Sequence, residues 1–164
     1  MPAVSTAPEP NALLRHTLAT LAYRAGKAVR GAPADFAGFK ASPETRTPVQ
    51  ILAHMGDLFD WALALADGRH DWHNSEPLPW DAEVQRFFNA VAAFDRRLAS
   101  AEPLGSEPER LFSGPIADAL THTGQIAMLR RMAGAPIRGE NYFKADIAAG
   151  RVGTEQPPAV VEFD

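Results

Sequence analysis

Three side chains that could coordinate a metal ion interrupt the apolar patterns of this sequence. His54 shares a face with Ile51 if residues 47–67 are helical, and Asp118 and His122 stand four apart in a second segment of helical pattern. Residues four apart lie on one face of a helix with about 6 Å of rise between them, so this carboxylate and imidazole can both reach one ion. With His54 opposite them, they form a set of two histidines and one carboxylate. Such a set suits Zn, Ni, Fe or Mn and leaves positions open for water or substrate.

The same pattern also fits a bundle without metal. A buried Asp118 could pair with a charged His122 or with Arg130, while His54 and Gln125 satisfy backbone or hydroxyl groups. An aspartate and a histidine four apart, together with a remote histidine, specify only three residue types, and chance supplies many such sets. The spacing alone therefore leaves two hypotheses, a metal site and a buried polar network in a metal-free bundle.

Four segments have the apolar periodicity of amphipathic helices, and they would position these side chains. They are residues 11–30, 47–67, 81–100 and 113–133. Asn11 is the expected N-cap of the first, Thr47 and Gln50 form a capping-box pattern at the start of the second, and Pro136 follows the end of the fourth. No segment predicts a convincing strand. We therefore expect an all-α fold, a four-helix bundle with long crossover loops and an irregular C-terminal tail.

The composition is that of a globular protein. The length of 164 residues fits a single domain, 1–164, and 46% hydrophobic with 22% charged residues excludes a disordered or fibrous chain. A formal net charge of −4 gives no broad attraction to nucleic acid or anionic lipid. No run reaches the roughly 18 apolar residues of a membrane span, and the first residues lack the basic and apolar regions of a signal peptide. We expect a cytoplasmic protein that binds neither nucleic acid nor membrane.

The sequence contains no cysteine. This excludes disulfides, thiolate nucleophiles and thiolate ligands, so histidine and carboxylate side chains are left for any transition-metal site. Any reactive thiol must come from a partner or cosubstrate.

Two runs of the sequence resemble the DinB/YfiT-like family of four-helix-bundle metalloenzymes. They are TPVQILAHMGDLFDWALALADG and DALTHTGQIAMLRRMAGAP, and the sharpest piece is the H-x-G-Q pattern of His122 to Gln125, matched with His54 on the second helix. In that family three histidines hold the metal, one on the second helix and two spaced by four on the last. The resemblance thus implies a site of His54, Asp118 and His122, in which Asp118 stands where the family has a histidine. Aspartate is a competent ligand, and its negative charge changes the metal preference and the acidity of a bound water.

The resemblance also implies an activity and partners. Members work as thiol-dependent transferases or isomerases that use low-molecular-weight thiols, and homodimers are frequent. We therefore expect a divalent transition metal, a low-molecular-weight thiol cosubstrate, a small-molecule substrate and a homodimer, with the metal activating a thiol or water. Two alternatives stay open: a non-catalytic metal-binding or stress-response protein, and an oxygenase centre built on two histidines and a carboxylate.

Five further residues are candidates for the surroundings of the site. Gln125 would orient a ligand or bond to the second helix. Asp57 would steady a ligand or act as a base near the ion, or it would lie on a solvated face of its helix. Pocket-lining roles are expected for residues near the junction of the last helix and the tail, namely Arg130, Asn141 and Tyr142.

Other histidines and the tryptophans are weaker candidates. His70 and His73 lie in a polar loop, where solvated histidines are the commoner case, and His16 lies off the apolar line of the first helix. The tryptophans either wall a pocket mouth or belong to the core edge, and they are Trp61, Trp72 and Trp80.

Overall fold

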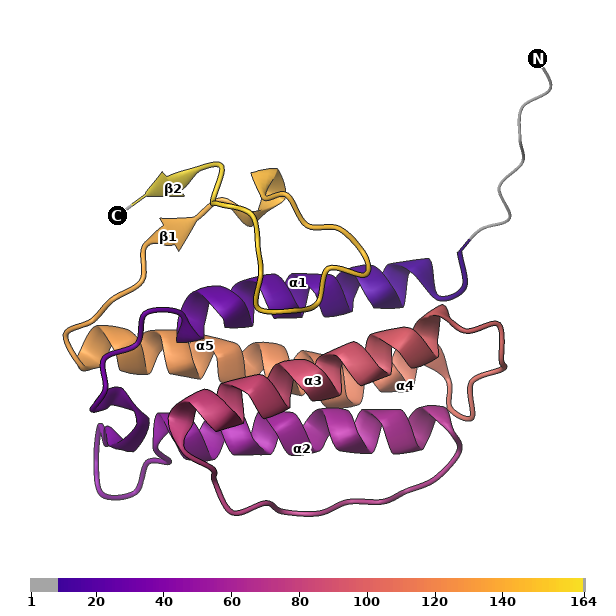
Figure 1. Ribbon diagram of the computed structural model, residues 1–164, viewed down its shortest axis with the longest axis horizontal. Coiled ribbons are helices and arrows are strands. Elements are labelled where there is room, and N and C mark those ends of the chain that lie inside the picture. The colour runs from indigo at the N-terminus through magenta and orange to yellow at the C-terminus, as the bar shows by residue number, and fades with distance from the viewer. Residues whose placement is uncertain (1–8, 164) are drawn as a thin grey trace.

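Four long helices pack against one another as a bundle in the computed structural model, which describes residues 9–163 (Figure 1). The long helices are α1 (Ala12–Val29), α2 (Pro48–Ala66), α3 (Trp80–Ala99) and α5 (Ala117–Met132). The short elements are η1 (Phe36–Gly38), α4 (Pro108–Leu111), η2 (Phe112–Ile116), β1 (Gly139–Glu140), η3 (Tyr142–Lys144) and β2 (Glu162–Phe163). The predicted all-α bundle is confirmed. No helix within residues 9–163 is both long and apolar enough to cross a membrane.

The bundle has α1 and α2 at opposite corners, and α3 and α5 each pack against both of them. Figure 1 shows α2 and α3 running in the same direction, so the chain between them must return along the whole bundle. Residues 67–79 make this return, and 13 extended residues span about 43 Å against roughly 30 Å for a helix of this length. The crossover loop is thus long because two parallel neighbours have to be joined, and it passes beside α2.

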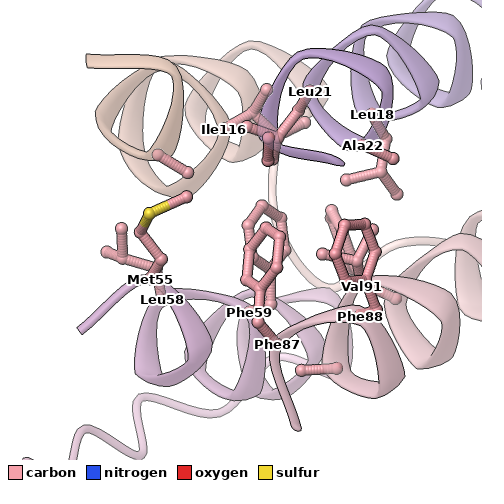
Figure 2. Packing of buried hydrophobic residues seen from close by; sticks show 14 of the residues in the cluster. Leu18, Leu21, Ala22, Met55, Leu58, Phe59, Phe87, Phe88, Val91 and Ile116 are labelled. Carbon is pink, nitrogen blue, oxygen red and sulfur yellow. The ribbon is translucent and has the colours of Figure 1, made fainter. Parts of the chain in front are cut away.

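The core is filled by apolar side chains from the inner faces of all four long helices (Figure 2). Phe59 of α2 lies with its ring centroid 6.0 Å from those of Phe87 and Phe94 on α3. Leu18 and Ile116 approach the same layer from the other two corners, and all five side chains are fully buried. This interior fixes α2 against the last helix and so sets the distance between the two halves of the candidate site.

Helix α2 begins at the capping box that the sequence predicts. The Thr47 hydroxyl accepts a hydrogen bond from the Gln50 N–H at 3.3 Å, and the Gln50 side chain accepts one from the Thr47 N–H at 2.9 Å. Asn11 stands at the N-cap position of α1, but the prediction that it caps that helix is wrong. It has a left-handed backbone with φ of 54°, and its side chain donates instead to the Leu98 carbonyl at 3.0 Å.

The last helix begins earlier than the sequence predicts. It starts at Pro108 as α4, widens into the π-helical turn η2, and continues without a break as α5. Pro115 lies inside that turn, where its missing N–H removes one backbone bond, and the Ala117 N–H reaches back five residues to Phe112. Pro115 therefore marks a widened turn rather than a helix start. The turn comes directly before Asp118 and helps to set where α5 presents that side chain.

The C-terminal tail lies over α1 (Figure 1). It is irregular as predicted, except that β1 and β2 form a two-residue antiparallel pair with Gly139 opposite Phe163. Glu140 fixes the tail, because its buried carboxylate accepts from the Tyr23 hydroxyl at 2.5 Å and from Lys27 at 2.8 Å.

Candidate metal centre

The structure brings His54 of α2 together with Asp118 and His122 of α5. The Nε2 atoms of both histidines lie 3.5 Å from Oδ2 of Asp118, and the two imidazole rings meet edge to face with centroids 4.8 Å apart. One ligand atom from each residue can be chosen so that all three lie within 4.8 Å of one another. The three residues thus form a compact group across the α2 and α5 contact.

These distances fit a shared cation better than hydrogen bonds. Ligand atoms about 2.1 Å from a tetrahedral ion stand about 3.4 Å apart, close to the two observed separations of 3.5 Å. Hydrogen bonds between nitrogen and oxygen are usually 2.7–3.2 Å long. The donor set of two imidazoles and one carboxylate is also one that Zn, Ni, Fe and Mn accept.

The hydrogen bond at Nδ1 of His122 determines whether Nε2 of the same ring is a donor or an acceptor. Nδ1 lies 2.7 Å from Oε1 of Gln125, and an amide oxygen can only accept, so Nδ1 carries the proton. In the neutral ring Nε2 is then a bare lone pair, and it faces the carboxylate of Asp118. Two acceptors that face each other repel unless a cation or a proton lies between them. Gln125 thus fixes the tautomer and the ring orientation of His122, as hydrogen-bond partners of metal-bound histidines usually do.

His54 is also prepared as a neutral ligand. Burial lowers the pKa of His54, the neighbouring His122 lowers it further, and the opposing attraction of Asp118 does not restore it. A neutral imidazole is the form that coordinates a metal. The His54 and His122 side chains are 21% and 13% exposed while Asp118 is 46% exposed, so the group opens toward solvent on the Asp118 side.

Aromatic rings cover His54 from the crossover loop. The Trp72 ring lies 5.6 Å from that of His54 and 5.7 Å from that of Trp61, edge to face in both cases. These two tryptophans therefore wall the group, as one of the two sequence interpretations expects. Trp80 lies elsewhere, edge to face against Phe36 with centroids 5.5 Å apart.

The group lies between two cavities. One of about 390 Å³ is lined by Asp118, Thr121 and residues of the π-helical turn such as Gly114. The other, of about 560 Å³, is lined by His122 and Gln125. A ligand in either cavity would touch a residue of the candidate centre.

Asp57 lies in a separate cluster on the next turn of α2. It is buried and accepts hydrogen bonds from the Ser75 N–H at 2.8 Å, from the Ser75 hydroxyl at 2.7 Å and from Arg86. Burial alone would raise the pKa of Asp57, but these bonds outweigh it and lower the pKa. His73 also contacts this carboxylate, with its Nε2 atom 3.0 Å from Oδ1 of Asp57.

Asp57, Asp60 and His73 also form a group whose spacing could hold a cation. The guanidinium of Arg86 already lies there, bonded to both carboxylates. Burial opposes its charge, but hydrogen bonds to Glu83 and Asp57 and the charge of these two carboxylates raise the pKa of Arg86. We therefore assign this group to fastening the crossover loop. The sequence did not indicate it, because Ser75 comes from a loop and Arg86 from α3, and no spacing pattern joins them to Asp57.

The remaining sequence candidates make structural contacts. Arg130 is buried and donates to backbone carbonyls at the end of α1 and beyond α5, which are those of Ala28, Arg30, Gly31 and Ala135. Asn141 accepts from the Phe143 N–H at the start of η3. Tyr142 packs edge to face on Tyr23, and Arg24 lies 4.0 Å above its ring. His16 is exposed, as expected.

Comparisons of the chain with family models, with curated proteins and with solved structures give no match. Membership of the DinB/YfiT-like family therefore stays a prediction from the sequence. What the structure itself shows is a four-helix bundle with a His, Asp, His group that could hold a metal ion.

Proposed function

We propose that this protein is a divalent-metal-dependent enzyme of the DinB-like kind that acts on a small molecule, with His54, Asp118 and His122 as the metal ligands. The observation that carries the proposal is the Nε2 lone pair of His122, which Gln125 leaves facing the Asp118 carboxylate at 3.5 Å. A divalent cation removes the repulsion between these two acceptors, whereas without a metal a proton on Nε2 of His122 would have to do so.

A bound divalent ion would supply Lewis acidity and would lower the pKa of a thiol or water placed beside it. The residues of the chain do the rest. Asp118 contributes one negative charge, Gln125 holds the His122 ring in its orientation, and Trp72 shields His54 from water. Three protein ligands leave room for a water or a thiol on the side where Asp118 is exposed.

The thiol of a thiol-dependent reaction must come from outside this chain, because the sequence has no cysteine. We propose a low-molecular-weight thiol as cosubstrate and a homodimer as the assembly. Sedimentation velocity on the purified protein measures the second, and a monomer at micromolar concentration would contradict it.

The experiment that tests the metal centre is elemental analysis and zinc calorimetry on protein purified without an affinity tag. We expect near-stoichiometric transition metal, lost in both His54→Ala and His122→Ala. His16→Ala is the matched control, because His16 is an exposed histidine on α1 outside the group, and it should keep full occupancy. Retention of full occupancy by His122→Ala would refute the site.

Turnover separates an enzyme from a non-catalytic metal-binding protein. The metal-loaded wild type should consume a low-molecular-weight thiol in the presence of small electrophiles, and His122→Ala should not. Stoichiometric metal without turnover for any thiol tried would favour the stress-response or storage alternative over the enzyme.

A further inference from the structure

The cavity on the His122 side has the composition of a binding site for an amphiphilic anion. It has a volume of about 560 Å³, within the range of small-molecule sites, and lies between the end of the loop before α2 and the outer face of α5. His122 and Gln125 form part of its wall. Whatever occupies it therefore touches the candidate metal centre.

Most of the wall is apolar. Ile51 and Leu129 are buried core residues that show one edge to the cavity, and Met128 and Met132 stand over it with 58% and 54% of their surface exposed. Methionine is unbranched and polarizable, so a pair of them adapts to ligands of varied shape. Apolar surface left open beside a polar centre gains free energy when an apolar ligand covers it.

One cation completes the wall. Arg46 lines the cavity just before the N-cap of α2, and it makes no hydrogen bond or ion pair with any residue in the described range 9–163. Its positive charge acts on the candidate metal centre, since it is one of the causes that lower the pKa of His54. By contrast, some arginines of the bundle are bonded to carboxylates, for example Arg15 to Asp95 at 3.0 Å and Arg97 to Asp67 at 2.7 Å. The guanidinium of Arg46 is free to form a paired hydrogen bond with an anion.

From these contacts we infer that this cavity binds the substrate, and that the substrate is a small molecule with an apolar body and a single carboxylate. The carboxylate pairs with Arg46, and the apolar body lies between Ile51, Leu129 and the two methionines, against His122. This inference rests on the proposed function, since it assigns the cavity to the substrate of the same metal centre. It narrows that function from small molecules in general to apolar carboxylates.

The methionines provide the measurement. The chain has four methionines, so protein labelled with ¹³C at the methionine methyl groups gives four resonances, assigned with single Met→Leu variants. Met128 and Met132 report on the cavity, and Met55, which is fully buried, reports on any wider rearrangement. The probes are 4-phenylbutyrate and its uncharged amide, added to the zinc-free protein and to the protein with added zinc.

We expect 4-phenylbutyrate to shift the Met128 and Met132 resonances saturably and to leave Met55 unchanged. The amide should bind about tenfold more weakly, and Arg46→Gln should lower the affinity for the carboxylate by a similar factor without changing that for the amide. Arg131→Gln is the matched control, an exposed arginine on α5 outside the cavity lining, and it should behave as the wild type.

Equal affinity for acid and amide, or unchanged affinity in Arg46→Gln, would overturn the inference. Binding that needs zinc and ignores Arg46→Gln would also overturn it, because the carboxylate would then be bound by the ion alone. Failure of the proposed function is distinguishable. If the protein takes up no zinc but still binds the carboxylate through Arg46, the cavity is an anion site and the proposed metal-dependent function is wrong.

Discussion

Replacing Asp118 by asparagine distinguishes a metal centre from a polar network by the sign of its effect on stability. In the metal-free wild type two acceptors, Nε2 of His122 and Oδ2 of Asp118, face each other at 3.5 Å. Asp118→Asn keeps the shape but supplies an N–H that can donate to Nε2. One additional hydrogen bond contributes about 0.5–1.5 kcal/mol, and the lower half of that range applies because Asp118 is 46% exposed. At about 2–4 °C per kcal/mol for a chain of this size, Tm should rise by about 1–4 °C.

With zinc bound, the wild type should become more stable than Asp118→Asn. A ligand at 100 times its Kd stabilises the native state by about 2.7 kcal/mol, and Asp118→Asn loses most of this gain because one charged ligand is gone. The assay is urea unfolding at pH 8, first with a chelator and then with zinc. Asp35→Asn is the control for removing one negative charge, since Asp35 is an exposed aspartate whose side chain makes no capping hydrogen bond to η1, and it should change neither result.

The reasoning fails if Asp118→Asn destabilises the chelated protein. That result would mean that Asp118 accepts a hydrogen bond from a charged histidine in the metal-free state, as the polar-network hypothesis requires. An unchanged response to zinc in the variant would separately remove Asp118 from the ligand set.

Three further changes test the scaffold around the centre. Asp57→Asn should lower the free energy of unfolding by about 2 kcal/mol at pH 7, a small loss for a buried ion pair because Arg86 is 21% exposed. The pKa of Asp57 is lowered on folding, so its stabilising effect is lost at low pH. In urea titrations the difference from wild type should therefore vanish as the pH falls below about 4. Phe59→Ala should cost about 3–5 kcal/mol in the same assay through the cavity it leaves, and a loss below 1 kcal/mol would contradict the packing. Thr47→Ala should cost about 1 kcal/mol by calorimetry, with Val49→Ala as the neighbouring control that leaves the capping box intact.

The helices and the grouping of His54, Asp118 and His122 could be predicted because each depends on local patterns. A capping box is written into four consecutive residues, and a histidine such as His54 stands out on a face built for burial. The spacing of Asp118 and His122 needs only the helical rise. These signals survive without knowledge of what the helices pack against.

The parts that escaped prediction depend on contacts between distant segments. Asp57 was expected beside the ion, yet its partners are Ser75 of the crossover loop and Arg86 of α3, which only the folded chain brings to it. The sequence predicts that the last helix starts at residue 113, because proline, here Pro115, is common in a first helical turn. The structure has Pro115 inside the helix, because the preceding turn packs against the bundle. Neither set of contacts produces a periodic pattern of residues from which it could be predicted.

The long return of the crossover loop has a consequence for how a newly made chain would acquire the proposed metal ion. His54 precedes Asp118 and His122 by more than sixty residues, and α3 and the whole crossover lie between them. Closing so long a loop carries an entropic cost in the unfolded chain, so only the local Asp118 and His122 pair can meet a cation before folding. During synthesis the complete ligand set exists only after the last helix has emerged and packed on α2. Metal capture should therefore follow folding, and the folded bundle, rather than the nascent chain, should choose which cation enters.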